Sequence, residues 1–493
     1  MRALSKSKIL AFRQCPRRLW LEVHRPDLKQ ESAATMASYD TGDKVGQIAR
    51  DLYNPDGSGR LIDIDALGFP GVFNATTEAL KHRAPVFEAA FTTGDALALA
   101  DVLLPTATDR WRMVEVKSST SVKDAQRDDV AVQAYVAKKA GVNLDGVAVA
   151  HIDSSWVYPG GHDYAGLLVE KNLTEEAVSR FGEVQQWIDS AQHIVAQKES
   201  PEIKTGPQCD SPYACGFYEH CASLEPAVEM PITWLPRFRA QAWIERGVVD
   251  LRDVPAEELN EVQTRVRDCT VAGTVYFDSR GAADDLAGLP LPGYFLDFET
   301  IQFGVPIWAG TRPYQQIPFQ YSVHKIGRNG TLKHGEFLDL SGADPSRAFA
   351  EHLIADCGTD GPVFVYNAAF EKSRMAELGE RYPDLRAGLE AIIGRVVDLL
   401  PVARNRYYHP SQKGGWSIKA VLPAAVPELS YEALDGVQNG GDAQEAFLEA
   451  IHLETPEDRK EALRKQLLAY CALDTYAMVR LWQVFSGRTD WKL

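Results

Sequence analysis

The alternation of hydrophobic and polar positions along the chain predicts an α/β protein with several short strands. Residues 95–104 alternate in this way, residues 111–119 alternate again, and turn-forming residues separate the two segments, so we expect a β-hairpin. Residues 128–141 then show helical periodicity. The same criteria predict strands at 293–300 and 361–367, a hairpin formed by 318–326 and 331–340, and a helix at 467–485.

Stretches rich in proline and glycine divide this pattern into three parts. We expect a first unit at residues 1–225, a small helical connector at 226–289 and a third unit at 290–493. With 493 residues and 45% hydrophobic content, the chain has enough apolar material for several cored domains. No apolar run is long enough for a signal-peptide core or a membrane span, which predicts a cytoplasmic protein without a membrane partner.

The net charge of −16 argues against a protein that coats nucleic acid, because neutralising phosphates requires a basic surface. It does not exclude an enzyme that holds a strand through a local patch. The first 29 residues could supply such a patch, although a solvated helix face explains the same charges. The basic residues there are Arg2, Lys6, Lys8, Arg13, Arg17, Arg18, Arg25 and Lys29.

Three residues of the first predicted hairpin could form a metal-dependent hydrolytic site. Asp101 lies on one strand, while Glu115 and Lys117 lie two residues apart on the other. Because strand side chains alternate between faces, Glu115 and Lys117 share one face and the neighbouring valines are expected to face the core. The two carboxylates would bind a divalent cation such as Mg²⁺, and Lys117 would orient water and stabilise phosphate charge. Glu88 is a weaker candidate.

Four of the 7 cysteines are candidates for a metal centre. Cys209, Cys215 and Cys221 lie close together, and Cys15 lies near the N-terminus. Four thiolates can hold an iron–sulfur cluster or a zinc ion, and the five-residue gaps lack the close Cys-x-x-Cys pair usual for zinc. Three others have no such neighbours and are expected to be small core residues, namely Cys269, Cys357 and Cys471.

These features together resemble the PD-(D/E)xK nucleases. The order of features is similar to that of the RecB-type nucleases that carry an iron–sulfur cluster. A strand acid is followed by the Glu-x-Lys strand and by a helix with Gln133, and the cysteines lie on both sides of these elements. That group includes the CRISPR-associated RecB-like exonucleases and the AddB nuclease domain. The resemblance covers about residues 1–225. It implies a restriction-endonuclease-like fold, a 4Fe–4S cluster on the four cysteines, metal at Asp101 and Glu115, and a site role for Gln133. The family usually places Tyr four residues after Gln, whereas Tyr135 follows by two and must point elsewhere.

A second set of carboxylates occurs in the C-terminal part. Asp297 and Glu299 share one face of the strand predicted at 293–300, and Tyr470 and Asp474 lie one turn apart on the predicted C-terminal helix. A strand-borne pair and a helix-borne acid can meet at the end of a sheet. They could then hold two metal ions, Mg²⁺ or Mn²⁺, on both sides of a phosphodiester, with the Tyr470 hydroxyl positioning water.

The C-terminal set resembles the DEDD exonucleases of the RNase H-like fold, such as the DnaQ proofreading type. The resemblance covers about residues 290–493, and the spacing of Tyr470 and Asp474 matches the tyrosine-containing subgroup. It implies catalytic roles for these two residues and metal binding at Asp297, Glu299 and Asp474. The middle motif departs from the family, since Glu371 stands where the family has Asp. Asp398 is the alternative source of the missing carboxylate, and the motif context favours Glu371.

The two sets together predict a metal-dependent DNA nuclease with a RecB-like site and a 3′-to-5′ exonuclease-like site, and with single-stranded DNA or DNA ends as its partner. The whole arrangement also resembles an uncharacterised bacterial family with a RecB-like N-terminal half, which fits DNA repair or defence against foreign DNA. Two alternatives stay open: a decayed C-terminal site that only positions nucleic acid, and RNA processing. Residues that could grip a single strand are Tyr407, Tyr408, His409, Lys413, Trp416 and Lys419. A structural turn explains the same loop, with its glycines and proline, equally well.

Overall fold

The computed structural model describes residues 3–488, and the α/β class predicted from the sequence is confirmed. The chain folds into two compact units. Unit 1 contains Met1–Ala227 and Phe303–Gln315, and unit 2 contains Val228–Gln302 and Gln316–Leu493. Residues 228–289 of the segment predicted as a connector therefore group with unit 2, and the loop at Phe303–Gln315 groups with unit 1.

Unit 1 is built on a seven-stranded sheet. Its strands follow the order β2-β3-β4-β5-β6-β7, with β1 beside β4. The predicted first hairpin is present as β4 and β5, which pair antiparallel. The strands are β1 (Leu4–Ser5), β2 (Arg60–Leu61), β3 (Val86–Thr92), β4 (Ala96–Ala107), β5 (Arg110–Lys117), β6 (Leu144–Ile152) and β7 (Leu168–Asn172).

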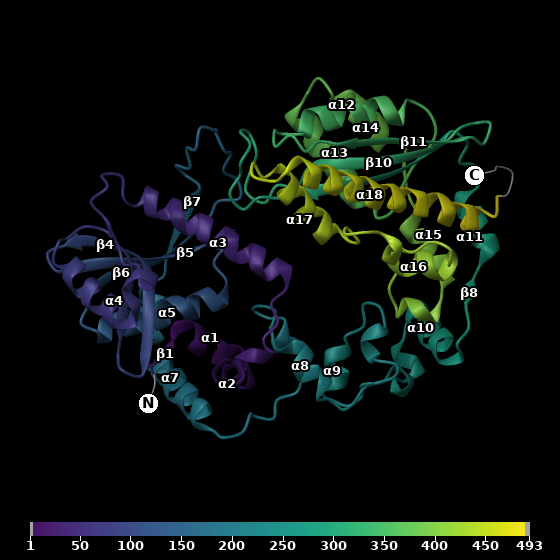
Figure 1. Cartoon of the computed structure of the whole chain (residues 1–493). Helices are drawn as coiled ribbons and strands as arrows, with labels where there is room; N and C mark the ends of the chain where they lie inside the picture. Colours follow the sequence, from purple (N-terminus) through teal and green to yellow (C-terminus); the bar gives the residue numbers. More distant parts are fainter. Residues whose placement is uncertain (1–2, 489–493) are drawn as a thin grey trace. The chain divides into compact units, whose positions relative to one another are not determined.

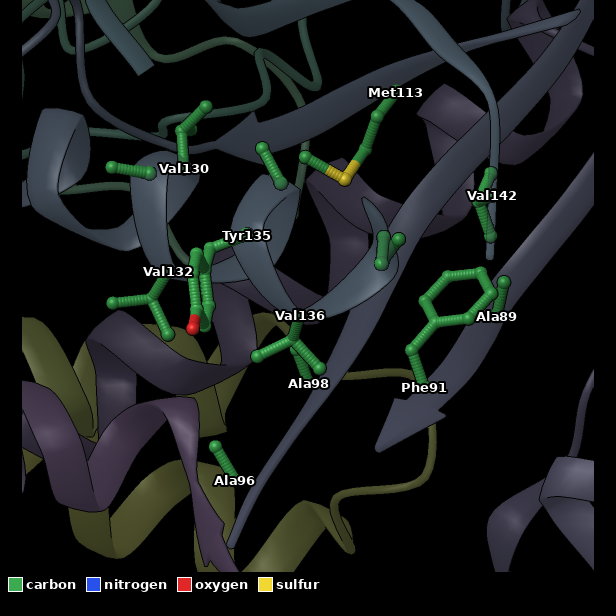
Figure 2. Packing of buried hydrophobic residues seen from close by; sticks show 14 of the residues in the cluster. Ala89, Phe91, Ala96, Ala98, Met113, Val130, Val132, Tyr135, Val136 and Val142 are labelled. Atoms are coloured by element: carbon green, nitrogen blue, oxygen red, sulfur yellow. The ribbon is translucent and has the colours of Figure 1, made fainter. Parts of the chain in front are cut away.

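Helices cover this sheet, and the main core forms under α5. Figure 2 shows Val132, Tyr135 and Val136 of α5 beside strand residues such as Ala98 and Met113. A second, smaller apolar cluster on other strand positions includes Val102 and Val114. The helices of unit 1 are α1 (Lys6–Gln14), α2 (Pro16–His24), α3 (Ala33–Leu52), α4 (Ile64–Leu80), α5 (Asp124–Lys139), α6 (Thr174–Ser179), α7 (Phe181–Ala196) and α8 (Tyr218–Ser223).

Unit 2 is built on a five-stranded mixed sheet in the order β11-β10-β9-β12-β13. The first three strands pair antiparallel, and β9, β12 and β13 run parallel. The predicted second hairpin is present as β10 and β11. The strands are β9 (Gly293–Ile301), β10 (Ile317–Ile326), β11 (Leu332–Leu338), β12 (Val363–Val365) and β13 (Val396–Asp398).

The two faces of this sheet carry different helices (Figure 1). Tyr294, Leu296 and Phe298 of β9 belong to a core cluster shared with α12 (Ser346–Cys357), α13 (Ala368–Arg381) and α14 (Arg386–Ile393). The alternate residues of β9 face α18 (Glu457–Ser486), where Phe295 contacts Trp482 edge to face. Because Asp297 and Glu299 have the same parity as Phe295, the α18 face carries the acidic pair.

The remaining elements of unit 2 are short. The segment 256–266, which has an amphipathic pattern, is interrupted at Leu259 and Asn260 between two separate helices. The elements before β9 are η3 (Ile232–Trp234), α9 (Ala240–Ile244), η4 (Leu251–Asp253), η5 (Ala256–Glu258), α10 (Glu261–Ala272), β8 (Tyr276–Phe277) and α11 (Ser279–Leu286). Those after β13 are α15 (Leu399–Arg406), β14 (Tyr407–Tyr408), η6 (Pro410–Gln412), α16 (Ile418–Ala425), η7 (Tyr431–Ala433) and α17 (Gly440–Ile451).

Within residues 3–488, no helix combines the length and the apolar character needed to cross a bilayer.

Candidate active sites

In unit 1, neighbouring strands bring three acids into one row. The pairing of Val102 with Val114 makes Asp101 and Glu115 the next pair along β4 and β5. On the other side of β4, Glu88 lies opposite Asp101, at a point where β3 is irregular and Glu88 has a left-handed φ of 57°. A non-glycine residue in this conformation is strained, and such residues concentrate at functional sites.

The acids line a cavity of about 420 Å³ in unit 1. Asp101, Glu115 and Lys117, which the sequence singles out, all lie on its wall, as does the weaker candidate Glu88. One carboxylate oxygen of Asp101 accepts a hydrogen bond from the Val116 N–H at 2.7 Å. The remaining lining comes from Lys6, Val102, Val116, Ser118 and, on α3, Gly42, Asp43, Gly46 and Arg50.

Two lysines neutralise the innermost acids of this site. Glu115 is 1% exposed, and its Oε1 accepts hydrogen bonds from Lys117 Nζ at 2.6 Å and Lys6 Nζ at 2.8 Å. Asp129 of α5 binds the same two ammonium groups at 2.7 and 3.4 Å. Gln133, one turn further on, donates its amide N–H to Glu115 Oε2. Glu115 and Lys117 therefore face α5.

The pKa values follow from this charge arrangement. Burial lowers the pKa of Lys117 and of Lys6, but Asp129 and Glu115 outweigh it and raise both above the usual range. Both lysines therefore stay protonated, and they balance the two buried carboxylates. Burial, aided by the charge of Glu115, raises the pKa of Glu88.

Tyr135 points away from this site, as its spacing from Gln133 predicts. Its hydroxyl donates to the side-chain oxygen of Gln185, and its ring packs edge to face on Phe181. The basic residues of the N-terminal segment are mostly occupied by neighbouring acids. Arg13 pairs with Asp128, and Arg18 and Lys8 pair with Glu22. Arg2 lies outside the described residues. These pairs favour the structural interpretation of the N-terminal charges over a nucleic-acid patch.

The four candidate cysteines of unit 1 line one small cavity. Cys15 precedes the first turn of α2, Cys209 ends a short 3-10 helix, and Cys221 lies in α8. The Cys215 N–H donates to the Cys209 carbonyl at 2.7 Å, which folds the triplet back on itself. All four are free thiols. The walls of the cavity also carry three cationic side chains, Arg17, Arg18 and Lys204.

In unit 2, Asp297, Glu299 and Asp474 come together although 175 positions separate Glu299 from Asp474 along the chain. Their ligand oxygens all lie within 4.8 Å of one another. Among residues 3–488, this is the one group of three or more His, Cys, Asp or Glu side chains with that spacing. Glu299 and Asp474 are buried, with exposed fractions of 8% and 5%. Such a set of clustered oxygens suits Mg²⁺ or Mn²⁺.

Burial raises the pKa values in this cluster, and mutual repulsion adds to it at Asp297 and Glu299. Burial and the charge of Asp474 raise the pKa of Glu299 to about 8. Burial raises the pKa of Asp474 to about 6, although its hydrogen bond from Tyr431 and the charge of Lys419 act in the opposite direction. Burial and then the charges of Asp474, Glu299 and Glu371 hold the pKa of Asp297 well above its usual range.

Tyr470 lies at the edge of the same cluster with two other polar side chains. Its hydroxyl oxygen accepts a hydrogen bond from Lys419 Nζ at 3.1 Å, and the ammonium group lies 4.8 Å from the centre of the Tyr470 ring. Tyr431 donates a 2.5 Å hydrogen bond to Asp474 Oδ1. Of the side chains that the structure describes, Lys419 is the one cation that lowers the pKa of Glu299 and Asp474, so it lies within reach of both acids.

Glu371 lies on the first turn of α13 and is 3% exposed. Its charge contributes to the raised pKa of Asp297, so it approaches the cluster, and burial raises its own pKa to about 8. Asp398 is engaged elsewhere. Its carboxylate accepts backbone hydrogen bonds from Asn367 at 3.0 Å and from Ala368 at 3.1 Å. It also caps α15.

Two carboxylate oxygens of unit 2 are buried without a hydrogen-bond partner, Asp474 Oδ2 and Glu371 Oε2. An unpartnered buried oxygen is costly, and a bound cation would satisfy it. This observation fits a metal ion held by the cluster.

The predicted strand-gripping aromatic residues are corrected by the structure. Tyr407, Tyr408 and Trp416 are at most 6% exposed, so their rings cannot stack on bases. The Tyr408 hydroxyl hydrogen bonds with Thr270, and the Trp416 indole N–H donates to the Tyr407 carbonyl. These two hydrogen bonds join short elements of unit 2, so Tyr408 and Trp416 have a structural role.

Three side chains that sequence reasoning did not assign to a site complete these arrangements. Asp129 could have been found, because it precedes Gln133 by four residues on one helical face. Lys6 was grouped with the surface charges of the N-terminal segment. Tyr431 carries no signal in its local sequence, since a 3-10 turn more than forty residues before Asp474 positions it.

The comparisons with known proteins add little. A family described as Domain of unknown function (DUF2779) matches residues 294–417, which include Asp297, Glu299, Glu371 and Asp398 but not Asp474. No curated protein matches the chain.

Proposed function

We propose that the chain is a metal-dependent DNA nuclease with a hydrolytic centre in each unit, acting in DNA repair or in defence against foreign DNA. The observation that carries the proposal is the convergence of Asp297, Glu299 and Asp474 within 4.8 Å. A strand and a distant helix supply these acids, and phosphodiester hydrolysis by paired metal ions needs such a set.

The sheet of unit 2 supports an RNase H-like exonuclease. Numbered from β9, its strands follow the order 3-2-1-4-5, with the second strand antiparallel to the first. This is the arrangement that the resemblance to the DnaQ type implies. The acid pair lies on the first strand and Asp474 on the last helix, at the positions expected from the same resemblance.

Asp297, Glu299 and Asp474 would hold Mg²⁺ or Mn²⁺, and Glu371 would complete the set directly or through water. Bound metal would polarise the phosphate and lower the pKa of the attacking water. Tyr470 would orient that water through its hydroxyl, whose oxygen accepts a hydrogen bond from Lys419 and which also acts on Asp474 through a side-chain hydrogen bond. Tyr431 holds Asp474 in place.

The site in unit 1 supports the RecB-like centre. Asp101 and Glu115 share a cavity wall with Lys117, as a PD-(D/E)xK site requires. Asp101 and Glu115 would bind the metal, and Lys117 would approach the scissile phosphate when it leaves Glu115. Gln133 fixes the Glu115 carboxylate from the opposite side.

The cysteine cavity fits a 4Fe–4S cluster held by Cys15, Cys209, Cys215 and Cys221. A single zinc ion with bonds of about 2.3 Å would hold its sulfurs roughly 3.8 Å apart. No three of these sulfurs lie within 4.8 Å of one another. The resemblance to the RecB-type nucleases therefore carries the assignment of a cluster, and the nearby Arg17, Arg18 and Lys204 would offset its negative charge. The centre would join the N-terminal helices to the segment after α7.

The test is cleavage of end-labelled single- and double-stranded DNA with Mg²⁺ or Mn²⁺, with matched RNA in parallel. We expect Asp297→Asn to remove the 3′-to-5′ products and Lys117→Ala to remove the products of the other site. Asp360→Asn and Lys138→Ala are the controls, because Asp360 is half-exposed beside an exposed arginine and Lys138 lies at the far end of α5. Unchanged cleavage in Asp297→Asn would leave unit 2 as a binding module, and exclusive cleavage of RNA would contradict the DNA assignment.

A further inference from the structure

A second cavity in unit 2, of about 530 Å³, lies outside both proposed catalytic sites. We call it the arginine cavity. Two arginines line it, Arg237 from the segment after η3 and Arg404 from α15. Its other walls are Pro236, the start of α10 at Asn260, Glu261 and Val262, and the loop residues Gly414 and Trp416. The volume is in the range of pockets that hold a nucleotide-sized ligand.

The two guanidinium groups are unpaired. Two other arginines of unit 2 are fully engaged: Arg406 pairs with Asp278 and Asp285, and Arg395 donates to five backbone carbonyls. Within residues 3–488, the guanidinium groups of Arg237 and Arg404 have no hydrogen bond or ion pair, although Glu261 lies at the same cavity. A guanidinium matches the geometry of phosphate oxygens, so a pair of free ones indicates an anionic ligand.

The backbone at Arg237 has an unusual conformation. Arg237 has a φ of 52°, a left-handed conformation that costs a non-glycine residue energy. Gly414, on the opposite wall, has a φ of 77°, and a Cβ atom there would lie 1.6 Å from the Trp234 carbonyl oxygen. Only glycine permits this contact between the loop and η3.

Hydrogen bonds between its walls hold the cavity open. Gln263 of α10 donates to the Pro236 carbonyl at 3.0 Å, and Arg265 of α10 donates to the Asn405 carbonyl at 2.6 Å. On the far wall, the Tyr366 hydroxyl donates to the Trp416 carbonyl at 2.7 Å. The cavity is therefore formed before any ligand binds.

Two segments that line the cavity also contain or adjoin residues near the carboxylate cluster. α15 begins at Asp398, beside Glu371, and Arg404 lies six residues later, about 9 Å along the helix axis. The loop wall ends at Trp416, and Lys419, three residues on, contacts Tyr470. A chain of phosphates that enters the cluster would reach the arginine cavity within a few nucleotides.

We propose that the arginine cavity is a nucleotide subsite of the exonuclease centre. It would hold one phosphate of a single strand on Arg237 and Arg404 and seat the adjoining base against Pro236. This inference rests on the proposed function of unit 2. It adds a requirement for substrate length, because a ligand with one phosphodiester cannot occupy the cluster and the cavity together.

The test uses three cavity variants, Arg237→Ala, Arg404→Ala and the two combined. Arg239→Ala is the control. Arg239 is exposed, lies two residues from Arg237 and does not line the cavity, so its removal changes the net charge equally. The probes are fluorescent oligothymidylates of two to twelve nucleotides, titrated in EDTA over a range of NaCl concentrations. A second substrate is the p-nitrophenyl ester of thymidine 5′-monophosphate, hydrolysed with Mn²⁺.

We expect each cavity variant to raise the Kd of the longer oligonucleotides about fivefold, the upper range for an exposed ion pair. The slope of log K against log salt should fall by about 0.7 for each phosphate that is no longer neutralised. Hydrolysis of the ester should stay at the wild-type rate. Arg404→Lys should keep most of the slope, which distinguishes the removal of a charge from local unfolding, and thermal melts would confirm the fold.

Equal Kd values and slopes in the cavity variants and in Arg239→Ala would overturn the inference while leaving cleavage by the wild-type protein, and thus the proposed function, intact. Loss of ester hydrolysis in Arg404→Ala would also overturn it, because the residue would then act at the scissile bond. A wild-type protein that neither binds oligonucleotides nor hydrolyses the ester would refute the proposed function itself.

Discussion

The two candidate catalytic centres contain similar numbers of acids but balance them in opposite ways. In unit 1, two lysines bridge Glu115 and Asp129, and the pKa values of the lysines rise. In unit 2, Lys419 is the one described cation beside the acid cluster, and the pKa values of the acids rise. The first arrangement is stable without a metal ion. In the second arrangement the buried carboxylates repel one another, and a bound cation would reduce that repulsion.

This difference matters for how each site would work. Metal binding in unit 1 must compete with Lys6 and Lys117 for the same carboxylate oxygens. Metal binding in unit 2 competes with protons instead. Unit 2 should therefore bind divalent ions more tightly above neutral pH, while the affinity of unit 1 depends on how readily its lysines move.

Removing the internal cations of unit 1 should have the largest effect. The double variant Lys6→Met/Lys117→Met leaves Glu115 buried and unpaired, which typically costs about 3–5 kcal/mol. Hydrogen exchange of β5 and α5 peptides would report the loss in the free energy of unfolding. Adding Glu115→Gln and Asp129→Asn, which removes both unpaired carboxylates, should restore most of it. The control Lys138→Met/Lys139→Met changes the same net charge at the end of α5 and should have little effect. Equal losses in both double variants would contradict the charge-balance interpretation.

Metal binding should stabilise unit 2 more than unit 1. At a metal concentration one hundred times the Kd, the expected gain is about 2.7 kcal/mol. Hydrogen exchange with and without Mn²⁺ should show new protection in β9 and α18. Asp297→Asn should abolish that protection, whereas Asp360→Asn should keep it. If Mn²⁺ protected amide hydrogens only in unit 1, the expectation that metal stabilises unit 2 more would be wrong.

Without metal, the stability of unit 2 should fall as pH rises. Between pH 4.5 and 8, folded Glu299 keeps a proton that the unfolded chain has already released. The free energy of unfolding therefore decreases with pH, by at most about 1.4 kcal/mol per pH unit for one proton. Denaturant titrations in EDTA would measure this slope. Glu299→Gln should reduce the slope by the share of one proton, because Asp297 and Glu371 also have raised pKa values. A slope of the opposite sign would refute the raised pKa values of the cluster.

The smallest expected signal is proton release on metal binding. At pH 7, Glu299 with a pKa of about 8 is roughly nine-tenths protonated, and a bound cation would displace that proton. Calorimetric titration with Mn²⁺ in buffers of different ionisation enthalpy would count the protons. We expect about one proton from Glu299 at pH 7, with Asp297 and Glu371 adding to the count, and fewer protons at pH 9.

Local patterns predicted much of the chain correctly. Both hairpins, the strand that carries Asp297 and the helices around Gln133 and Asp474 were predictable, because periodicity depends on which face each residue must bury. The Glu-x-Lys and Asp-x-Glu pairs could be placed on common faces for the same reason. The aromatic residues of the loop before α16 were misinterpreted as surface groups, since a local sequence does not show what covers it.

The sequence by itself determined the element types, the pairs of residues that share a face, and the chemistry open to its acids and thiols. Those properties depend on spacing along one element. Tertiary structure alone decided that Lys6 enters the first site, that Tyr431 binds Asp474, and that Arg237 and Arg404 share a cavity. It also decided that Asp398 binds the Asn367 and Ala368 backbone while Glu371 approaches the cluster. Each of these contacts joins segments far apart in the chain, and their proximity is set by how helices and strands pack.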